Sequence, residues 1–194
     1  MKKISILLLM LAVLLAVGIS GCLGGDADDE IVADDDSSKS SFTDDDLNYS
    51  TNIVTVRDLP SGFEFLSTQS VKSHGEGVGI TDVLYGYRGY YKFENDTVSN
   101  GTVYFYCFKT NSTGDAERYY QQMKNSYESS NGDNADVSTV TINGHDATKF
   151  TTANGSGTDM IAWTRGNLIF AAKGQVAGQI DYETLKFLAE ASEL

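Results

Sequence analysis

The chain has 194 residues, of which 27 are acidic and 14 are basic, giving a formal net charge of −13. This balance disfavours nucleic-acid binding, because neutralising phosphate groups requires clustered Lys and Arg side chains. The length suits one globular domain with a proper core, and a second globular domain is not expected.

The first residues have the organisation of an export signal. Lys2 and Lys3 form a basic start, and residues 4–17 form an apolar run that only Ser5 interrupts. This run is shorter than the roughly 20 apolar residues that a membrane-spanning helix needs. We therefore expect a cleaved signal peptide over residues 1–21.

The sequence Ile19-Ser20-Gly21-Cys22 resembles the lipobox of prokaryotic lipoproteins. The resemblance implies that Cys22 is lipidated, becomes the new N-terminus and holds the protein on the outer face of the cytoplasmic membrane. The alternative is an ordinary signal peptide that is cleaved elsewhere, with Cys22 an incidental thiol. The Gly24-Gly25 pair and the acidic tract that follows resemble surface lipoproteins of archaea, methanogens in particular.

Residues 22–50 follow as an acidic linker. Ten of the 27 acidic residues lie between Asp26 and Asp46, against the single base Lys39. This Asp- and Ser-rich segment has too few large apolar side chains to offset chain ordering, so we predict that it is disordered and extended. Its two Asp-Asp-Asp runs lack the Gly and terminal Glu of a calcium loop, which favours a solvated spacer over a cation site.

Asn-x-Ser/Thr sequons are frequent in the chain. Such acceptors belong on exposed loops of exported proteins, and four of the five fall in turn-like stretches. We expect some of them to be glycosylated; the alternative is a Ser/Thr/Asn-rich surface that forms sequons by chance. The five asparagines are Asn48, Asn95, Asn100, Asn111 and Asn154.

From residue 51 onward, alternating apolar patterns predict strands, and two patterns of helical spacing predict helices. Asn143-Gly144 suits the positive φ angles of a type I′ hairpin turn, and Asp181 can cap the second helix. The predicted strands are residues 53–56, 63–71, 84–93, 103–108, 137–142, 145–152, 159–164 and 168–173. The predicted helices are residues 115–130 and 181–193. The order ββββαββββα predicts a single α+β domain over residues 51–194, with a mainly antiparallel sheet and two packed helices.

Three motifs of this domain carry a second resemblance. They are Leu59-Pro60-x-Gly62-Phe63, the strand Val103-Tyr104-Phe105-Tyr106 leading to Asp115-Ala116-x-x-Tyr119, and Trp163-x-x-Gly166-Asn167-Leu168-Ile169-Phe170. Together they resemble uncharacterised exported archaeal lipoproteins and, more distantly, PsbP-like small envelope domains. The resemblance in these motifs does not imply any catalytic residue.

Residues suited to catalysis or metal binding are few. Within its aromatic strand Cys107 is expected to be a buried apolar residue, and a nucleophile would need a nearby base. His74 and His145 lie in or beside turns without partners at ligand spacing. Gly75-x-Gly77-x-Gly79 has neither dinucleotide nor P-loop spacing and is predicted to be a loop. We therefore expect no enzyme activity, no cofactor and no metal.

The aromatic residues give the one positive indication of a site. Alternation places four aromatic residues on one face of the strand 84–93 and Arg88, Tyr90 and Lys92 on the other. Packing beneath the helices is the favoured interpretation, because the sheet needs a core. Alternatively, these three residues, with Trp163 or with the Tyr104/Tyr106 side, form a platform that stacks on sugar rings or holds a partner chain. The four aromatic residues are Tyr85, Tyr87, Tyr91 and Phe93.

The sequence as a whole indicates a membrane-anchored extracytoplasmic lipoprotein. Its domain is interpreted as a non-catalytic binding or interaction module for an envelope glycan, a solute or an envelope protein. One alternative is a cell-envelope hydrolase. The other is an envelope assembly factor or lipid carrier, which would need an apolar cavity beside the sheet.

Overall fold

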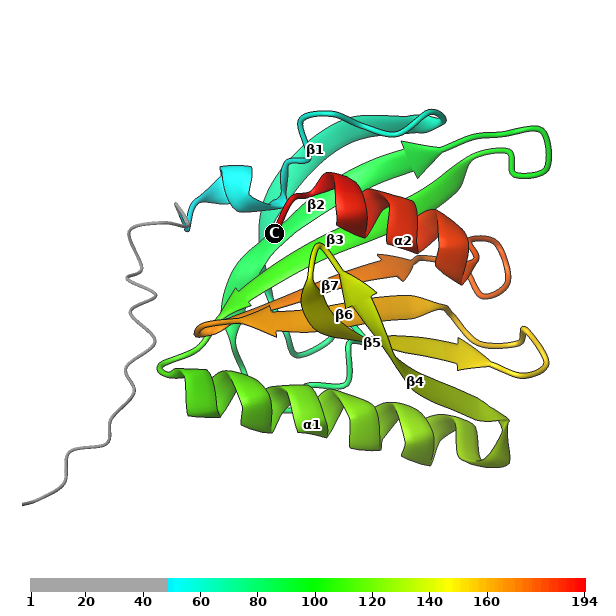
Figure 1. Cartoon of the computed structure of the whole chain (residues 1–194). Helices are drawn as coiled ribbons and strands as arrows, with labels where there is room; N and C mark the ends of the chain where they lie inside the picture. The colour runs from blue at the N-terminus through cyan, green and yellow to red at the C-terminus, as the bar shows by residue number, and fades with distance from the viewer. Residues whose placement is uncertain (1–48) are drawn as a thin grey trace, which may run out of the picture. The chain divides into compact units, whose positions relative to one another are not determined.

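The computed structural model describes residues 49–194 (Figure 1). The predicted signal peptide, Cys22, the acidic linker up to residue 48 and the sequon at Asn48 lie outside the described residues. Over residues 49–194, none of the helices has both the length and the apolar character needed to cross a bilayer.

Seven strands form one sheet in the order β1-β2-β3-β7-β6-β5-β4, and every neighbouring pair is antiparallel. The strands are β1 (Phe63–Lys72), β2 (Tyr85–Phe93), β3 (Gly101–Lys109), β4 (Ala135–Ile142), β5 (His145–Thr152), β6 (Met160–Arg165) and β7 (Leu168–Gly174). The helices are α1 (Thr113–Asn131) and α2 (Tyr182–Ala191), with short 3-10 helices η1 (Thr51–Val54) and η2 (Gly132–Asn134). The predicted α+β class is confirmed, and all these strands and both α-helices were predicted to within two residues at each end.

One predicted strand, residues 53–56, is wrong: the chain forms the 3-10 helix η1 there. The reason is that a buried side chain of β2, Tyr91, forms hydrogen bonds with the backbone of this segment. The hydroxyl of Tyr91 donates a hydrogen bond to the carbonyl of Val54 at 2.6 Å and accepts one from the amide of Val56 at 2.9 Å. Gly89 leaves room for this approach, since a Cβ there would collide with the Val54 carbonyl. The element order is therefore βββαββββα.

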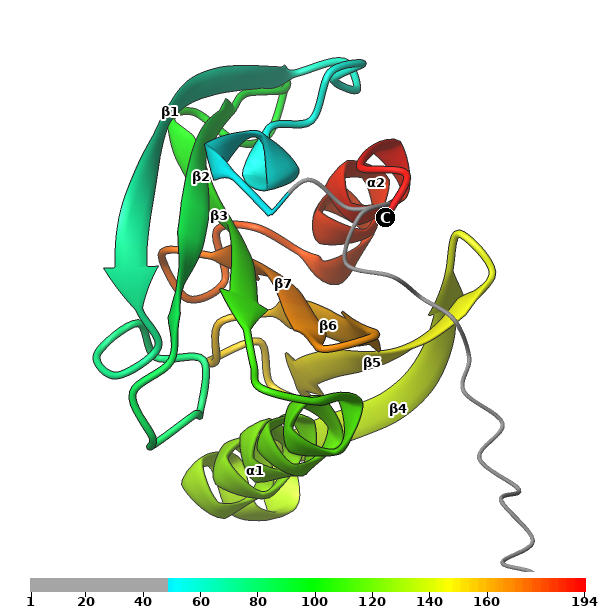
Figure 2. The same cartoon turned by 90° about the vertical axis from the view of Figure 1, so that its left-hand side faces the viewer.

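The sheet is strongly curved, and both of its faces carry helices (Figure 2). α2 packs on β6 and β7 and η1 packs on β1 to β3, on one face, while α1 packs on β4, β6 and β7 on the other. The first face has a stacked aromatic core of Phe105, Trp163 and Phe170, with ring centroids 5.4–6.4 Å apart. Burying side chains of this size stabilises the fold by roughly 1.5–3 kcal/mol each.

Local signals fix the ends of several elements. The side chain of Ser112 accepts a hydrogen bond from the Asp115 amide at the start of α1. Asp181 accepts one from the Thr184 amide at 2.9 Å, which confirms the predicted cap of α2. Asn143 and Gly144 have φ angles of 50° and 83°, as a type I′ turn between β4 and β5 requires.

Candidate functional site

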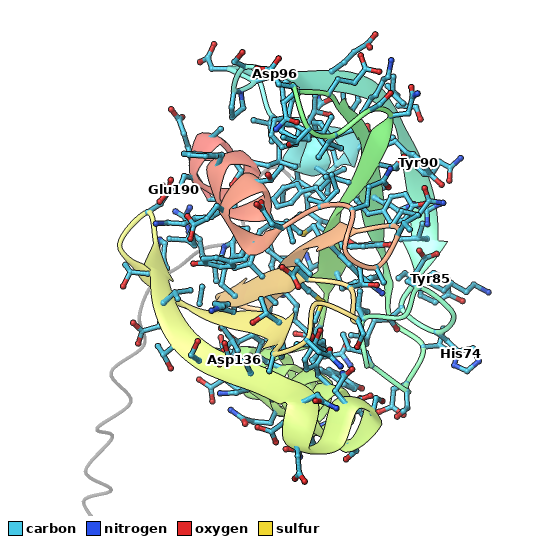
Figure 3. The ribbon with its side chains drawn as sticks, turned by 90° about the vertical axis from the view of Figure 1, so that its right-hand side faces the viewer. His74, Tyr85, Tyr90, Asp96, Asp136 and Glu190 are labelled. Atoms are coloured by element: carbon cyan, nitrogen blue, oxygen red, sulfur yellow. The ribbon has the colours of Figure 1, made fainter. Side chains whose placement is uncertain are left out.

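α1 covers only one half of its face of the sheet, and the half formed by β2 and β3 carries polar and aromatic side chains. The strand register pairs Arg88 with Tyr106, Tyr90 with Tyr104 and Lys92 with Thr102, so these six residues share one face. We call them the β2–β3 outer surface, in which Tyr106 lies underneath the others and is only 1% exposed. Figure 3 shows Tyr90 pointing outward, on the side of the sheet away from α2.

Arg88 is the centre of the β2–β3 outer surface. Its guanidinium lies over the rings of Tyr90 and Tyr104, 4.6 and 4.8 Å from their centroids. It also forms an ion pair with Glu76 at 2.5 Å and donates a hydrogen bond to the Gln69 side chain at 2.8 Å. The Arg88 and Glu76 side chains are only 15% and 18% exposed, so the pair is largely removed from water and holds the guanidinium in place.

The tyrosines around Arg88 are held by contacts of their own. Tyr90 and Tyr104 meet edge to face at 4.7 Å, and the Tyr90 hydroxyl donates to that of Tyr104 at 3.4 Å. Tyr106 donates to Glu76 at 3.1 Å. Burial raises the pKa of Tyr106, and burial together with the contact to Tyr90 raises the pKa of Tyr104 to about 12. These phenols therefore stay neutral and can donate or accept hydrogen bonds.

Lys92 lies at the rim of this surface. It forms an ion pair with Glu94 at 2.9 Å, and both side chains are substantially exposed. An exposed pair of this kind contributes little to stability. Its ammonium group is thus already neutralised locally, and the surface as a whole is not a strongly cationic patch.

Of the four predicted platform residues, Arg88, Tyr90 and Lys92 lie on one face of β2. The fourth, Trp163, does not lie on that face. Trp163 is 0% exposed and packs in the core against Phe105 and Phe170, on the opposite face of the sheet. The prediction that it belongs to the platform is wrong, because β6 turns this side chain toward α2. The alternative partners, Tyr104 and Tyr106, are the ones that the register places beside Arg88 and Tyr90.

The aromatic face opposite the β2–β3 outer surface is core only in part. Tyr91 and Phe93 are buried, which confirms the packing interpretation for them. Tyr87 is partly buried and packs against Tyr49, at a centroid distance of 5.2 Å. Tyr85 is 65% exposed at the start of β2, so the core does not reach the first residue of this strand.

The predicted glycine-rich loop lies between β1 and β2 and closes over one end of the surface. Ser73 ties its two ends together, donating to the Asp82 carbonyl at 2.6 Å and accepting from the Leu84 amide at 2.9 Å. Gly77 and Gly79 have φ angles of 66° and 82°, a region that side chains disfavour. A Cβ on Gly79 would also lie 3.0 Å from that of Ser126 in α1. The glycines therefore allow the loop to pack closely against α1.

A small cavity of about 200 Å³ lies between this loop, the second half of α1 and the ends of β6 and β7. Sequence reasoning missed it, and it also missed Glu76, Tyr127 and Lys173. The spaced glycines were the one available signal, since they indicate a backbone that something approaches closely. They do not indicate what approaches it.

Comparison with known proteins places the domain in a family. Residues 78–191 match the family described as Domain of unknown function (DUF4367). The chain belongs to the DUF4367 family. The matched DUF4367 segment runs from the glycine-rich loop to the end of α2, and it includes β2 to β7 and both α-helices.

Two further comparisons add little to the family assignment. The DUF4367 chain is similar to the extracellular domain of PknH from Mycobacterium tuberculosis, with 11% sequence identity and a TM-score of 0.39. The similarity covers 74% of this chain and 88% of that one. No curated protein matches the chain. The resemblances to archaeal lipoproteins and to PsbP-like domains stay predictions.

Four sequons of the DUF4367 chain lie on exposed loops. Asn95, Asn100, Asn111 and Asn154 are all exposed, as expected for acceptors. The loops of Asn95, Asn100 and Asn154 follow the ends of β2 and β5, while Asn111 lies at the other end of β3. Their glycosylation stays a prediction.

The cysteine and histidines lie where the sequence predicts. Cys107 is fully buried, and burial raises the pKa of its thiol well above the ordinary value, so it is a core residue. His74 is exposed in the glycine-rich loop, and His145 begins β5 beside its hairpin turn. Within residues 49–194, no three His, Cys, Asp or Glu side chains are grouped as a metal site would require.

Proposed function

We propose that this protein is a membrane-anchored extracytoplasmic lipoprotein whose domain acts as a non-catalytic binding module through the β2–β3 outer surface. The observation that carries the proposal is the contact of Arg88 with the rings of both Tyr90 and Tyr104, on the half of this sheet face that α1 does not cover. The export-signal pattern and Cys22 support the location.

The composition of the surface suits binding. Tyr and Arg are enriched among the residues that dominate protein interfaces, because each combines a large contact area with directional polar groups. Arg88 and both tyrosines are already held by intramolecular contacts. Little side-chain entropy is therefore lost when a ligand binds, which reduces the cost of association.

The hydrolase alternative receives less support from the geometry. Glycoside hydrolysis uses two carboxyl groups that face the scissile bond. Glu76 is the carboxylate beside Arg88, and it already accepts hydrogen bonds from Arg88 and Tyr106. This role positions the guanidinium and leaves Glu76 poorly placed to act as an acid or a nucleophile.

The lipid-carrier alternative needs a large apolar cavity. The cavity beside the glycine-rich loop measures about 200 Å³ and has an ammonium group and hydroxyls in its lining. Ligand pockets typically measure roughly 300–1,000 Å³. The cavity therefore favours a much smaller ligand than a lipid chain.

Two experiments test the proposal in the native host. Cys22→Ser should move the chain from the membrane fraction to the soluble fraction, and a variant that stays in the membrane would contradict lipid anchoring at Cys22. In-cell crosslinking with mass spectrometry should then recover a recurrent envelope partner crosslinked near the β2–β3 outer surface. Turnover of an envelope substrate by the purified chain would contradict the non-catalytic role.

A further inference from the structure

The cavity beneath the glycine-rich loop is lined by two hydrogen-bond donors whose capacity the protein does not fully use. Lys173, near the end of β7, donates one hydrogen bond to the Gly77 carbonyl at 2.6 Å. An ammonium group has three protons to donate. The Tyr127 hydroxyl is buried and has no hydrogen-bond partner within residues 49–194. A buried donor without an acceptor is unusual in a native fold and calls for an explanation.

Burial acts on the two groups in different ways. Burial, and then the charges of Asp159 and Asp136, raise the pKa of Tyr127 to about 12, so its hydroxyl stays protonated. Burial lowers the pKa of Lys173 because the charged form loses solvation there, and the charge of Glu76 offsets only part of this effect. An anion beside Lys173 would restore part of that lost stabilisation.

The nearby acidic groups are already engaged. Glu76 accepts hydrogen bonds from Arg88 and Tyr106. Asp136 pairs with Lys149 at 3.2 Å. Asp159 directly precedes β6, and the Tyr182 backbone amide at the start of α2 acts to lower its pKa. Within residues 49–194, none of these three carboxylates accepts a hydrogen bond from Lys173 or Tyr127.

The rest of the lining includes an apolar part. Val78, Met123 and Met160 are 1%, 0% and 3% exposed and line the cavity together with Lys173 and Tyr127. Methionine side chains adapt their shape to what packs on them. For scale, an engineered apolar cavity of roughly 150 Å³ in another protein binds benzene. A cavity of about 200 Å³ therefore has room for a small organic molecule.

We propose that this cavity binds a small carboxylate of about six to nine non-hydrogen atoms. Its carboxylate accepts hydrogen bonds from Lys173 and Tyr127, and its short hydrocarbon part packs on Met123 and Met160. One negative charge matches the one ammonium group in the lining. This site goes beyond the proposed function, because it takes a small molecule at a place distinct from Arg88 and Tyr90 on the β2–β3 outer surface.

The test uses the full chain, labelled with ¹⁵N and purified in detergent, with 3-methylbutanoate and benzoate as probes. Their amides, 3-methylbutanamide and benzamide, have nearly the same shape without the charge. We expect both carboxylates to shift the amide signals of Gly77, Gly79 and Ser126 saturably, with dissociation constants in the millimolar range or tighter. The amides should bind at least about tenfold more weakly, since hydrogen bonds to charged groups are the stronger ones.

Variants separate this site from the β2–β3 outer surface. Tyr127→Phe removes only the hydroxyl and should weaken carboxylate binding by about 2- to 10-fold. Lys173→Met keeps the aliphatic stem and should remove the preference for carboxylate over amide, whereas Tyr90→Ala should change neither. If Lys173→Met does not fold, Tyr127→Phe and the amide comparison decide. The proposal is overturned if neither carboxylate saturates the wild-type chain, if the amides bind equally well, or if Tyr127→Phe binds like the wild type.

Discussion

The hydroxyl of Tyr91 should be one of the more important polar groups of this fold. Tyr91→Phe removes one oxygen atom that accepts from Val56 and donates to Val54, both in buried backbone. A buried polar group left without a partner costs about 1–3 kcal/mol. With two such groups, and some relief from water reaching η1, we expect a loss of about 2–4 kcal/mol in the free energy of unfolding.

Thermal and urea denaturation of the full chain would measure this loss. For a protein of this size the change corresponds to a decrease in Tm of about 5–15 °C. Tyr85→Phe is the matched control, because Tyr85 is 65% exposed and its hydroxyl makes no hydrogen bond within residues 49–194, so the change should be within about 0.5 kcal/mol. Equal stability of Tyr91→Phe and the wild type would refute the account of why residues 51–54 are helical.

Two further substitutions test other parts of the structure. Gly79→Ala should lower the free energy of unfolding by about 1–3 kcal/mol, because its φ of 82° and the contact with Ser126 both oppose a side chain. Gly144 also has a positive φ but has open space around it, so Gly144→Ala should lower the free energy of unfolding by less. An equal loss in the two variants would argue against close packing of the glycine-rich loop on α1. Burial raises the pKa of Asp159 in the folded chain above its value in the unfolded chain. The neutral carboxyl group therefore favours folding at pH values below the unfolded-state pKa, and this contribution is lost as the pH rises through the folded-state pKa. Asp159→Asn should therefore stabilise the chain at pH 7, by less than about 1 kcal/mol because solvent screens this partly exposed group, and the gain should vanish near pH 3. Urea denaturation of the variant and the wild type at both pH values measures the difference. A variant that is less stable than the wild type at pH 7 would contradict the prediction.

Local sequence patterns were sufficient for most of the fold. The hairpin between β4 and β5 follows from alternation around Asn143-Gly144, and α2 begins at the residue that Asp181 caps. These signals act between residues close in sequence. The strand predicted at residues 53–56 failed because a short apolar run cannot distinguish a strand from a buried turn. The deciding contact, from Tyr91, comes from 35 or more residues away.

In the candidate site, too, short-range patterns were predictable from the sequence and long-range contacts were not. Alternation predicts that Arg88 and Tyr90 share a face, but not which strand lies beside them, and so it could not choose between Trp163 and Tyr104. That choice depends on the pairing of β2 with β3. The cavity depends on an even longer connection, because Lys173 and Gly77 are 96 residues apart. Sequence periodicity cannot predict contacts between residues so far apart in the chain.

Position-specific photocrosslinking in the native host can show whether a partner binds at the β2–β3 outer surface. A photoreactive residue replaces Ser67, which is exposed and lies opposite Tyr90 in the register, or Glu128, which is exposed on α1. The account predicts a specific crosslinked product from position 67 that is absent from position 128 and is lost when Tyr90→Ala is added. Equal crosslinking from both positions, or a product from position 67 that survives Tyr90→Ala, would contradict it.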